Sequence, residues 1–261
     1  MSLDHGAGFV KSQTTTRDAF LGGRITITQP KSGFRAGLDT ILLGASVAAD
    51  SRTLLDLGSG VGTAALTALT HNIRLEALLA EKNPQMLALA RENILHNNLG
   101  ERALAVELDV TAAGDVRSAA GLKTDYFSTV IANPPFFDAA GGTKAPETGR
   151  ADARHMHEDA LDKWVRTAAA SAAPRGEVIF IYRADGLTEL LKAFSARFGA
   201  ITVLPIVPRS DGDANRILLR GIKGSRAPLV LKSPLVLHGA EGHGFVADID
   251  AIFRGNGVLH W

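Results

Sequence analysis

Short, largely apolar runs alternate with segments of helical character along most of this chain. The runs cover residues 53–57, 75–80, 103–108, 127–132 and 177–182, and each stops at a glycine or a polar residue. Runs of this length are typical of strands buried on both faces, as in a parallel sheet. Because helices must connect neighbouring parallel strands, the alternation predicts a doubly wound α/β sheet.

The segments between these runs carry helix signals. In the strongest one, residues 84–97, Asn83 can cap the helix, Pro84 suits the first position, and apolar residues recur at every fourth place. Further candidate helices follow Gly62 and cover residues from about 159 to 172 and from about 187 to 198.

The two ends of the chain follow a different pattern. Residues 24–28 alternate isoleucine with polar side chains, which predicts a short antiparallel strand or hairpin before the sheet. Near the other end, the apolar runs 201–207 and 216–222 are joined by a polar segment too short for a helix, which predicts an antiparallel hairpin. The expected fold is a Rossmann-like doubly wound seven-stranded sheet, mostly parallel, with a C-terminal antiparallel hairpin.

Composition excludes several classes of protein. Apolar residues make up 46% of the 261 residues, which is ordinary for a globular chain. There is no cysteine, so disulfides, thiol nucleophiles and cysteine-bound metals are excluded. The formal charge of +1 argues against a protein that coats nucleic acid non-specifically, although it leaves RNA open as a partner.

Membrane and export signals are not found either. No stretch approaches about 18 uninterrupted apolar residues, so no transmembrane helix and no membrane partner are expected. The first residues lack the apolar core of a secretory signal, so we expect a cytoplasmic protein whose residues 1–13 are disordered. The sequence does not indicate an oligomeric state.

A glycine loop follows the first apolar run. Asp56 precedes Gly58, Gly60 and Gly62, and glycines at such a turn let a ligand approach the main chain closely. A P-loop would need Lys-Ser/Thr after the last glycine, and a dinucleotide fingerprint would need glycine at position 63, where Thr63 stands.

Acidic residues at two strand ends narrow the choice of ligand. Asp56 would repel a pyrophosphate but suits an ammonium or sulfonium group. Glu81 lies 25 residues further on, where a carboxylate can accept hydrogen bonds from ribose hydroxyls. The pattern favours a cationic nucleoside as cofactor, and the plainer alternative is a strand terminator followed by a solvated glutamate.

The segment Asn133-Pro134-Pro135-Phe136-Phe137 follows the fourth apolar run. The prolines stiffen the turn and leave carbonyl oxygens without local partners, while the asparagine adds an amide acceptor and the aromatic a stacking face. Such a group can hold a planar NH2 group through positioning and electrostatics, without a strong base. The alternative is a strand end with two buried phenylalanines.

In this order, the glycine loop, Glu81, Asp109 and residues 133–136 resemble class I S-adenosylmethionine-dependent methyltransferases that modify amino nitrogens. Residues 29–45 (QPKSGFRAGLDTILLGA) are similar to the amino-terminal signature of bacterial tRNA (adenine-N6) methyltransferases acting on valine tRNA. The resemblance covers the chain from about residue 14. It implies a single methyltransferase domain over residues 14–261, with an amino-terminal hairpin and helix extension, and tRNA as the partner.

The resemblance also implies a role for each motif. Asp56 and the glycine loop would hold the methionine moiety, Glu81 the ribose and Asp109 the adenine amine of the cofactor. Asn133 and Pro134 would hold the target amine, Phe136 would stack on its ring, and Pro135 and Phe137 would line the substrate side. The family's tetrapeptide usually ends in tyrosine, so Phe136 keeps the stacking face without the hydroxyl. Related motifs serve protein-glutamine and small-molecule methyltransferases, and a non-catalytic RNA-binding module would share the fold.

Three further segments have alternative interpretations. His155 and His157 lie two apart near a helix start, which favours capping over metal binding, and we expect no metal site. Residues 139–149 are expected to form a flexible loop beside the substrate. Residues 209–232 hold six basic and two acidic residues, which form either a solvated edge or a track for a phosphate backbone.

Overall fold

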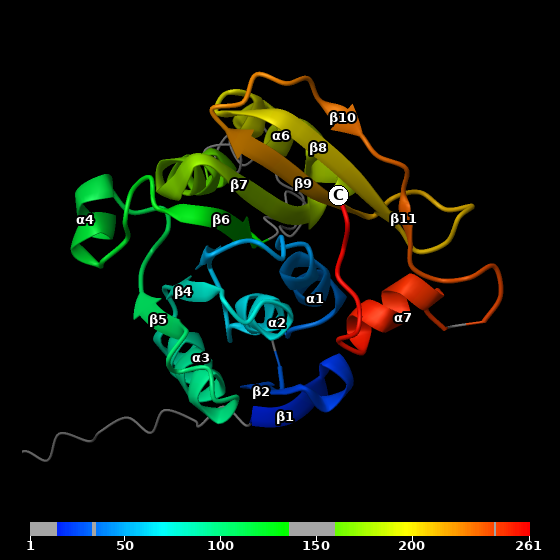
Figure 1. Cartoon of the computed structure of the whole chain (residues 1–261), viewed down its shortest axis with the longest axis horizontal. Coiled ribbons are helices and arrows are strands. Elements are labelled where there is room, and N and C mark those ends of the chain that lie inside the picture. The colour runs from blue at the N-terminus through cyan, green and yellow to red at the C-terminus, as the bar shows by residue number, and fades with distance from the viewer. Residues whose placement is uncertain (1–14, 33–34, 136–159, 243) are drawn as a thin grey trace, which may run out of the picture.

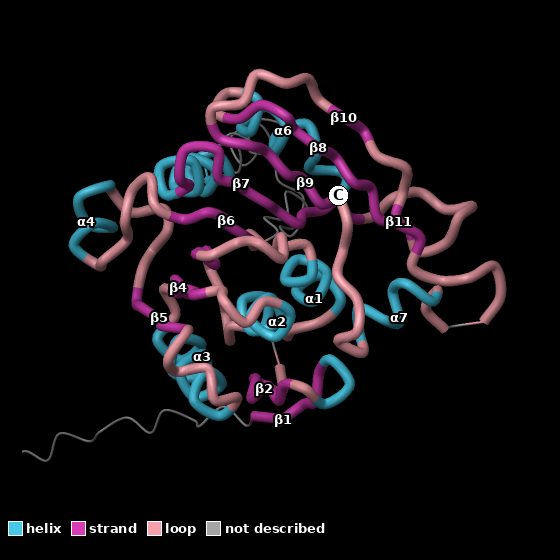
Figure 2. The backbone as a smooth tube through the Cα atoms, viewed as in Figure 1, coloured by secondary structure: helices cyan, strands magenta, loops and turns pink. Residues whose placement is uncertain are grey.

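The computed structural model describes residues 15–32, 35–135, 160–242 and 244–261. The segment expected to be disordered (1–13), the loop 139–149, and the residues Phe136, Phe137, His155 and His157 lie outside the described residues. Figure 1 shows the arrangement of the elements and Figure 2 the path of the backbone.

One large sheet organises the described part of the chain. Its strands are β3 (Thr53–Leu57), β4 (Glu76–Glu81), β5 (Ala103–Glu107), β6 (Phe127–Ala132), β7 (Ala172–Arg183), β8 (Phe198–Val207), β9 (Arg216–Lys223), β10 (Val230–Leu231) and β11 (Leu235–Val236). Their order is β10-β8-β9-β7-β6-β3-β4-β5, with β11 also pairing with β8. Strands β3 to β7 pair in parallel, whereas β9 is antiparallel to β7 and β8. This confirms the Rossmann-like prediction and the carboxyl-terminal hairpin.

Three details differ from the prediction. Strand β8 begins at Phe198 rather than at residue 201, and the helix expected over about 187–198 ends at Ser195, because Phe198 already pairs with Lys223 of β9. The two-residue strands β10 and β11 extend the expected seven strands to nine, because the chain after β9 runs back along the free edge of β8. Strand β7 begins at Ala172 rather than at residue 177, since Ala172 already pairs with Phe127 before a register irregularity.

Helices cover both faces of the sheet. They are α1 (Leu38–Ala45), α2 (Thr63–His71), α3 (Pro84–His96), α4 (Gly114–Ala119), a helix over residues 160–171, α6 (Leu187–Ser195) and α7 (Ala247–Phe253), with 3-10 turns at Leu21–Gly23 and Ala184–Gly186. The predicted cap of α3 is confirmed, because Oδ1 of Asn83 accepts hydrogen bonds from the amides of Gln85 and Met86. No described helix is long and apolar enough to cross a membrane.

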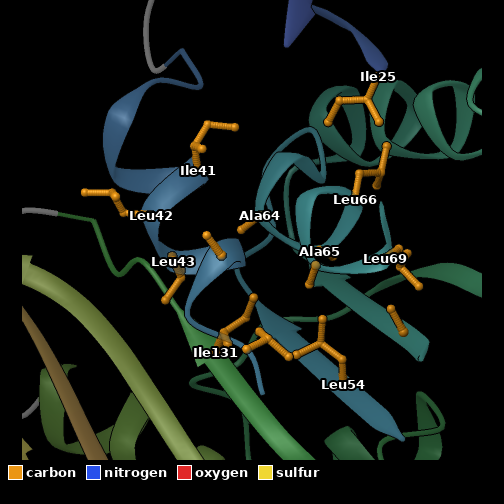
Figure 3. Close-up of a cluster of buried hydrophobic side chains, with 14 of the residues drawn as sticks. Ile25, Ile41, Leu42, Leu43, Leu54, Ala64, Ala65, Leu66, Leu69 and Ile131 are labelled. Atoms are coloured by element: carbon orange, nitrogen blue, oxygen red, sulfur yellow. The ribbon is translucent and has the colours of Figure 1, made fainter. Parts of the chain in front are cut away.

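The core on one face joins α1, α2 and the centre of the sheet, where Leu42, Leu54 and Leu66 are fully buried (Figure 3). Burying each such side chain contributes about 2 kcal/mol. The predicted amino-terminal hairpin is a separate antiparallel pair, β1 (Thr15–Phe20) and β2 (Ile25–Pro30). It packs against α2 and α3, and its Ile25 joins this core. The other face is covered by the helix over residues 160–171 and by α6.

Candidate active site

The four strands that carry the predicted motifs end at one edge of the sheet. Leu57, the last residue of β3, pairs with Ala80 of β4 and Ala132 of β6. Glu81 pairs with Glu107 at the ends of β4 and β5. Since these strands are parallel, the segments that follow them emerge together, which is where open α/β sheets bind ligands.

The glycine loop adopts a backbone that only glycine accepts without strain. Gly58, Gly60 and Gly62 have φ angles of +63°, +57° and +89°. A Cβ atom at Gly58 would lie 2.3 Å from the ring of Trp164, whereas one at Gly60 would meet no atom within 4 Å. The loop is therefore closely packed at Gly58 and open at Gly60, where a ligand can approach the main chain.

Glu81 holds this loop. Its Oε2 accepts a 2.8 Å hydrogen bond from the amide of Gly60, and its Oε1 accepts a 2.7 Å bond from the amide of Asn83. A carboxylate oxygen can accept two hydrogen bonds, so both oxygens retain capacity for a hydroxyl group. The amide of Ser59 donates to the carbonyl of Ala80, which fixes the loop to β4 a second time.

Asp56 lies buried near the end of β3. Its side chain accepts a 3.2 Å hydrogen bond from the amide of Ala65 in the first turn of α2. Burial raises the pKa of Asp56 to about 7; the bond from Ala65 lowers it and the charge of Glu81 raises it further. A buried acid with so high a pKa gains most from a nearby cation.

Asp109 follows β5 and is largely, though not completely, exposed. Its Oδ1 accepts hydrogen bonds from the amide and the hydroxyl of Thr111, at 2.8 and 2.7 Å. Partial burial raises the pKa of Asp109, but these two bonds and the charges of Lys82 and Lys163 outweigh it, and the pKa lies below its usual value. Asp109 is therefore an ionised acceptor.

Asn133 directly follows β6, beside the strand that carries the glycine loop. Its Nδ2 is buried and has no hydrogen-bond partner among the described residues. Leaving such a donor unpaired costs about 1–3 kcal/mol, which a bound acceptor would recover. Pro134 is buried and Pro135 exposed, so the structure places three of the five residues of this segment at the site edge.

Two further hydroxyls of the loop share this property. Ser59 Oγ and Thr63 Oγ1 are buried without a hydrogen-bond partner in the described ranges. A polar nucleoside cofactor with a cationic part fits three features of this edge. These are the unpaired donors, the open main chain at Gly60 and the acidic groups at two strand ends. Neither Ser59 nor Thr63 was singled out from the sequence, because a hydroxyl beside a glycine loop is common.

Trp164 was also missed by the sequence reasoning. It lies in the helix over residues 160–171, buried against Gly58, and Thr167 of the same helix donates to the carbonyl of Val110. This helix therefore braces both the glycine loop and the segment after β5. The sequence did not indicate this role of Trp164, since a tryptophan in a helix is usually a core residue.

A cavity of about 320 Å³ lies elsewhere, at the amino-terminal ends of the strands. Thr53, Glu76, Arg102 and Tyr126 are among its lining residues, and none of the predicted site residues borders it. We assign the site to the opposite edge, because the unpaired polar atoms of Ser59, Thr63 and Asn133 gather there with the buried acid.

Most basic side chains of the carboxyl-terminal segment 209–232 pair with other groups of the protein. Arg216 pairs with Asp39, Arg220 lies near Glu177 and the ring of Trp261, and Lys223 pairs with Asp125. Arg209 donates to the carbonyls of Gly239 and Gly242. Four of the six basic side chains thus have structural partners, which favours a stabilised edge over a phosphate track.

Comparison with known proteins agrees with this geometry. Residues 37–203 match the family model of the methyltransferase small domain. The tRNA1(Val) (adenine(37)-N6)-methyltransferase of Aeromonas hydrophila is 28% identical over 224 residues, which cover 83% of this chain and 87% of that protein. The enzyme of the same name from a Flavobacteriaceae bacterium (strain 3519-10) is 28% identical over 159 residues, which cover 60% of this chain and 63% of that protein.

Solved structures share the fold. A protein from Agrobacterium tumefaciens described as a predicted O-methyltransferase superposes with a TM-score of 0.72 at 30% identity, covering 85% of this chain and 98% of that one. TYW2 from P. horikoshii, in complex with MeSAdo, has a TM-score of 0.53 at 13% identity, covering 82% and 73%. The family match and the site together identify the chain as a member of the methyltransferase small domain family, an S-adenosylmethionine-dependent methyltransferase.

Proposed function

We propose that this enzyme methylates an amino nitrogen, most specifically N6 of an adenine in tRNA. The observation that carries the proposal is the carboxamide of Asn133, held at the strand end beside the glycine loop with its Nδ2 unpaired among the described residues. The names of the relatives from Aeromonas hydrophila and the Flavobacteriaceae bacterium support adenine N6 and tRNA.

A carboxamide matches the edge of adenine. Its oxygen accepts a hydrogen from the exocyclic amine while its NH2 donates to an adjacent ring nitrogen, as asparagine does when it recognises adenine. In this proposal Asn133 makes both bonds, and the main-chain carbonyl of Pro134 accepts the second amine hydrogen. Drawing these hydrogens out of the ring plane localises the lone pair on nitrogen, so positioning and electrostatics replace a strong base.

The aromatic and proline residues complete the substrate side. Phe136 stacks on the target ring, with Pro135 and Phe137 lining the pocket. A base inside a duplex cannot reach such a pocket, so the target adenine must be unstacked, which favours a loop of the tRNA. Residues 14–261 act as one domain in this scheme, in the cytoplasm where tRNA is found.

When bound, the cofactor would supply a methyl group on a cationic sulfur. The carbon–sulfur bond breaks as the carbon–nitrogen bond forms, S-adenosylhomocysteine leaves as a neutral thioether, and the methylated nitrogen loses one proton to solvent. Asp56 and the glycine loop hold its methionine part, supported by the burial and high pKa of that acid. Glu81 holds the ribose through the acceptor capacity that its two main-chain bonds leave. Asp109 accepts from the adenine amine, supported by its ionised state.

The Agrobacterium tumefaciens relative favours a second candidate, methylation of an oxygen. A hydroxyl acceptor would also need a base to remove its proton, and Asn133 cannot act as one. A protein glutamine or a small-molecule amine would satisfy Asn133 as adenine does, so these acceptors are the alternatives that the transfer experiment distinguishes from tRNA.

Labelled-methyl transfer to bulk RNA, protein and small-molecule fractions, run in parallel, tests the proposal. We expect label in the RNA fraction with the wild-type protein and none with Asn133→Ala, which should still bind S-adenosylhomocysteine with nearly unchanged affinity. Label only in protein or small molecules would overturn the RNA assignment. Tight RNA binding without transfer to any fraction would instead indicate a non-catalytic binding module.

A further inference from the structure

Two asparagines on α3, one helical turn apart, hold the free edge of the amino-terminal hairpin. Asn97, at the end of the helix, accepts from the amide of Thr26 at 2.9 Å and donates to its carbonyl at 2.8 Å. Asn93 makes the same pair of bonds with Thr28, at 2.7 and 3.0 Å. Each carboxamide thus pairs with β2 as a neighbouring strand would, and Figure 1 shows α3 beside the hairpin.

Of these two asparagines, only Asn93 also contacts the glycine loop, which is the proposed cofactor loop. Its Nδ2 donates a 3.0 Å hydrogen bond to the carbonyl of Val61, inside the glycine loop, and its side chain is fully buried. The third bond of Asn97 stays within its own helix, to the carbonyl of Asn93. The two residues therefore share the pair of bonds to β2 and differ in two respects: Asn93 contacts the loop and is fully buried, whereas Asn97 bonds within its own helix and is partly exposed.

The bond from Asn93 leaves the peptide unit between Val61 and Gly62 hydrogen-bonded at both ends. The carbonyl of Val61 is held by Asn93, and the N–H of Gly62 in the same peptide unit donates to the carbonyl of Ser59 at 2.9 Å. Because both ends of the unit are bonded, the peptide cannot rotate without breaking a buried hydrogen bond. Ser59, whose carbonyl accepts one of these bonds, and Gly60, which lies between Ser59 and this peptide unit, are thereby held in place.

We propose that Asn93 is a positioning residue that couples the amino-terminal hairpin to the cofactor loop. The inference rests on the proposed function only in taking the glycine loop as the cofactor site. One carboxamide bonded to both elements ties their conformations, so a ligand that orders the loop also stabilises the hairpin. Such coupling is reciprocal: loosening the hairpin contact at Asn93 weakens cofactor binding.

Asn93→Ala and its matched control Asn97→Ala test this proposal, with S-adenosylhomocysteine as the probe in calorimetric titration. Both variants lose two bonds to β2, so both loosen the hairpin. We expect Asn93→Ala to weaken the probe by about fivefold to thirtyfold, the equivalent of one or two buried hydrogen bonds, and Asn97→Ala to change it less than about twofold. Equal effects in the two variants would overturn the proposal.

Hydrogen exchange measured by mass spectrometry gives a second readout, in the wild-type protein and in both variants. In the wild-type protein the probe should slow exchange both in the loop, residues 58–66, and in β2, residues 25–30. In Asn97→Ala both responses should remain, whereas in Asn93→Ala the response of β2 should disappear. Protection of the loop without any response of β2 in the wild type would contradict the coupling. Failure of the wild-type protein to bind the probe at all would instead overturn the cofactor assignment.

Discussion

The amide of Gly60 donates a 2.8 Å hydrogen bond to the carboxylate of Glu81, so the last residue of β4 holds the loop that follows β3. The same carboxylate also accepts from the amide of Asn83, which starts the turn into α3. Any group that binds Glu81 therefore touches a side chain that already fixes the loop and the start of the next helix. Loop geometry and the proposed ribose binding therefore depend on one residue.

Replacing Glu81 should reveal both roles. Glu81→Ala removes two charge-assisted bonds to the main chain and the proposed ribose acceptor, so S-adenosylhomocysteine should bind about tenfold to a hundredfold more weakly in calorimetric titration. Glu81→Gln keeps one carbonyl oxygen, so its affinity for S-adenosylhomocysteine should lie between those of the wild type and Glu81→Ala. An affinity within about twofold of wild type for Glu81→Ala would show that the carboxylate does not serve the cofactor.

Alanine at the first and at the middle glycine of the loop should have unequal effects. Gly60→Ala introduces only the strain of a left-handed backbone, about 1–2 kcal/mol, since a Cβ there meets no atom within 4 Å. Gly58→Ala carries the same strain and also drives a methyl group to 2.3 Å from Trp164, which should add about 1–3 kcal/mol. Urea unfolding of the two variants measures the difference.

The contact with Trp164 can be checked by a double-mutant cycle. Trp164→Leu shortens the side chain that the new methyl group meets. The double variant Gly58→Ala/Trp164→Leu should therefore be destabilised by less than the sum of the two single variants. With Gly60→Ala the same substitution should be additive. Additivity in both pairs would mean that Trp164 does not restrict Gly58.

The buried acid predicts a distinctive pH dependence of stability. The native pKa of Asp56 is about 7 and its ordinary value is 3.8. Between these values the native state holds a proton that the unfolded state has released, so this residue's contribution to stability is present at low pH and is lost as the pH rises toward 7. The slope is at most about 1.4 kcal/mol per pH unit. The difference between wild type and Asp56→Asn in urea unfolding should follow this slope, and a difference independent of pH would contradict it.

The same titration should appear in cofactor binding. A cationic ligand favours the ionised carboxylate, so S-adenosylhomocysteine, with its charged amino group, should bind more tightly as the pH rises through about 7. Methylthioadenosine lacks that amino group and should show little change, as should either ligand with Asp56→Asn. Identical pH profiles for the two ligands would remove Asp56 from the recognition of the methionine part.

Much of the fold could be predicted because the signals were local. The run 53–57 and the cap at Asn83 are dictated by nearby residues, and both are found in the structure. Strands β10 and β11 were not foreseen, because two-residue strands exist only through pairing with β8. The early start of β7 likewise depends on Phe127, which lies 45 residues earlier in the sequence.

The site was predictable only where its residues follow strands. Asp56, Glu81, Asp109 and Asn133 each stand at or just after a strand end, and parallel pairing brings such ends to one edge. Asn93 and Trp164 lie within helices and contact elements far away in the sequence, and neither spacing nor residue type distinguishes them from ordinary buried side chains. The pairing of Arg216 with Asp39 was hidden for the same reason, so the charge count overstated the free positive charge of the hairpin.

The most direct test of the proposed activity is nucleoside mass spectrometry of an unmodified valine tRNA transcript incubated with the protein and S-adenosylmethionine. We predict one N6-methyladenosine per tRNA with the wild-type protein, and none with Asn133→Ala at the same cofactor occupancy. An unmodified transcript, under conditions where the protein methylates another class of acceptor, would contradict the assignment of adenine in tRNA as the substrate.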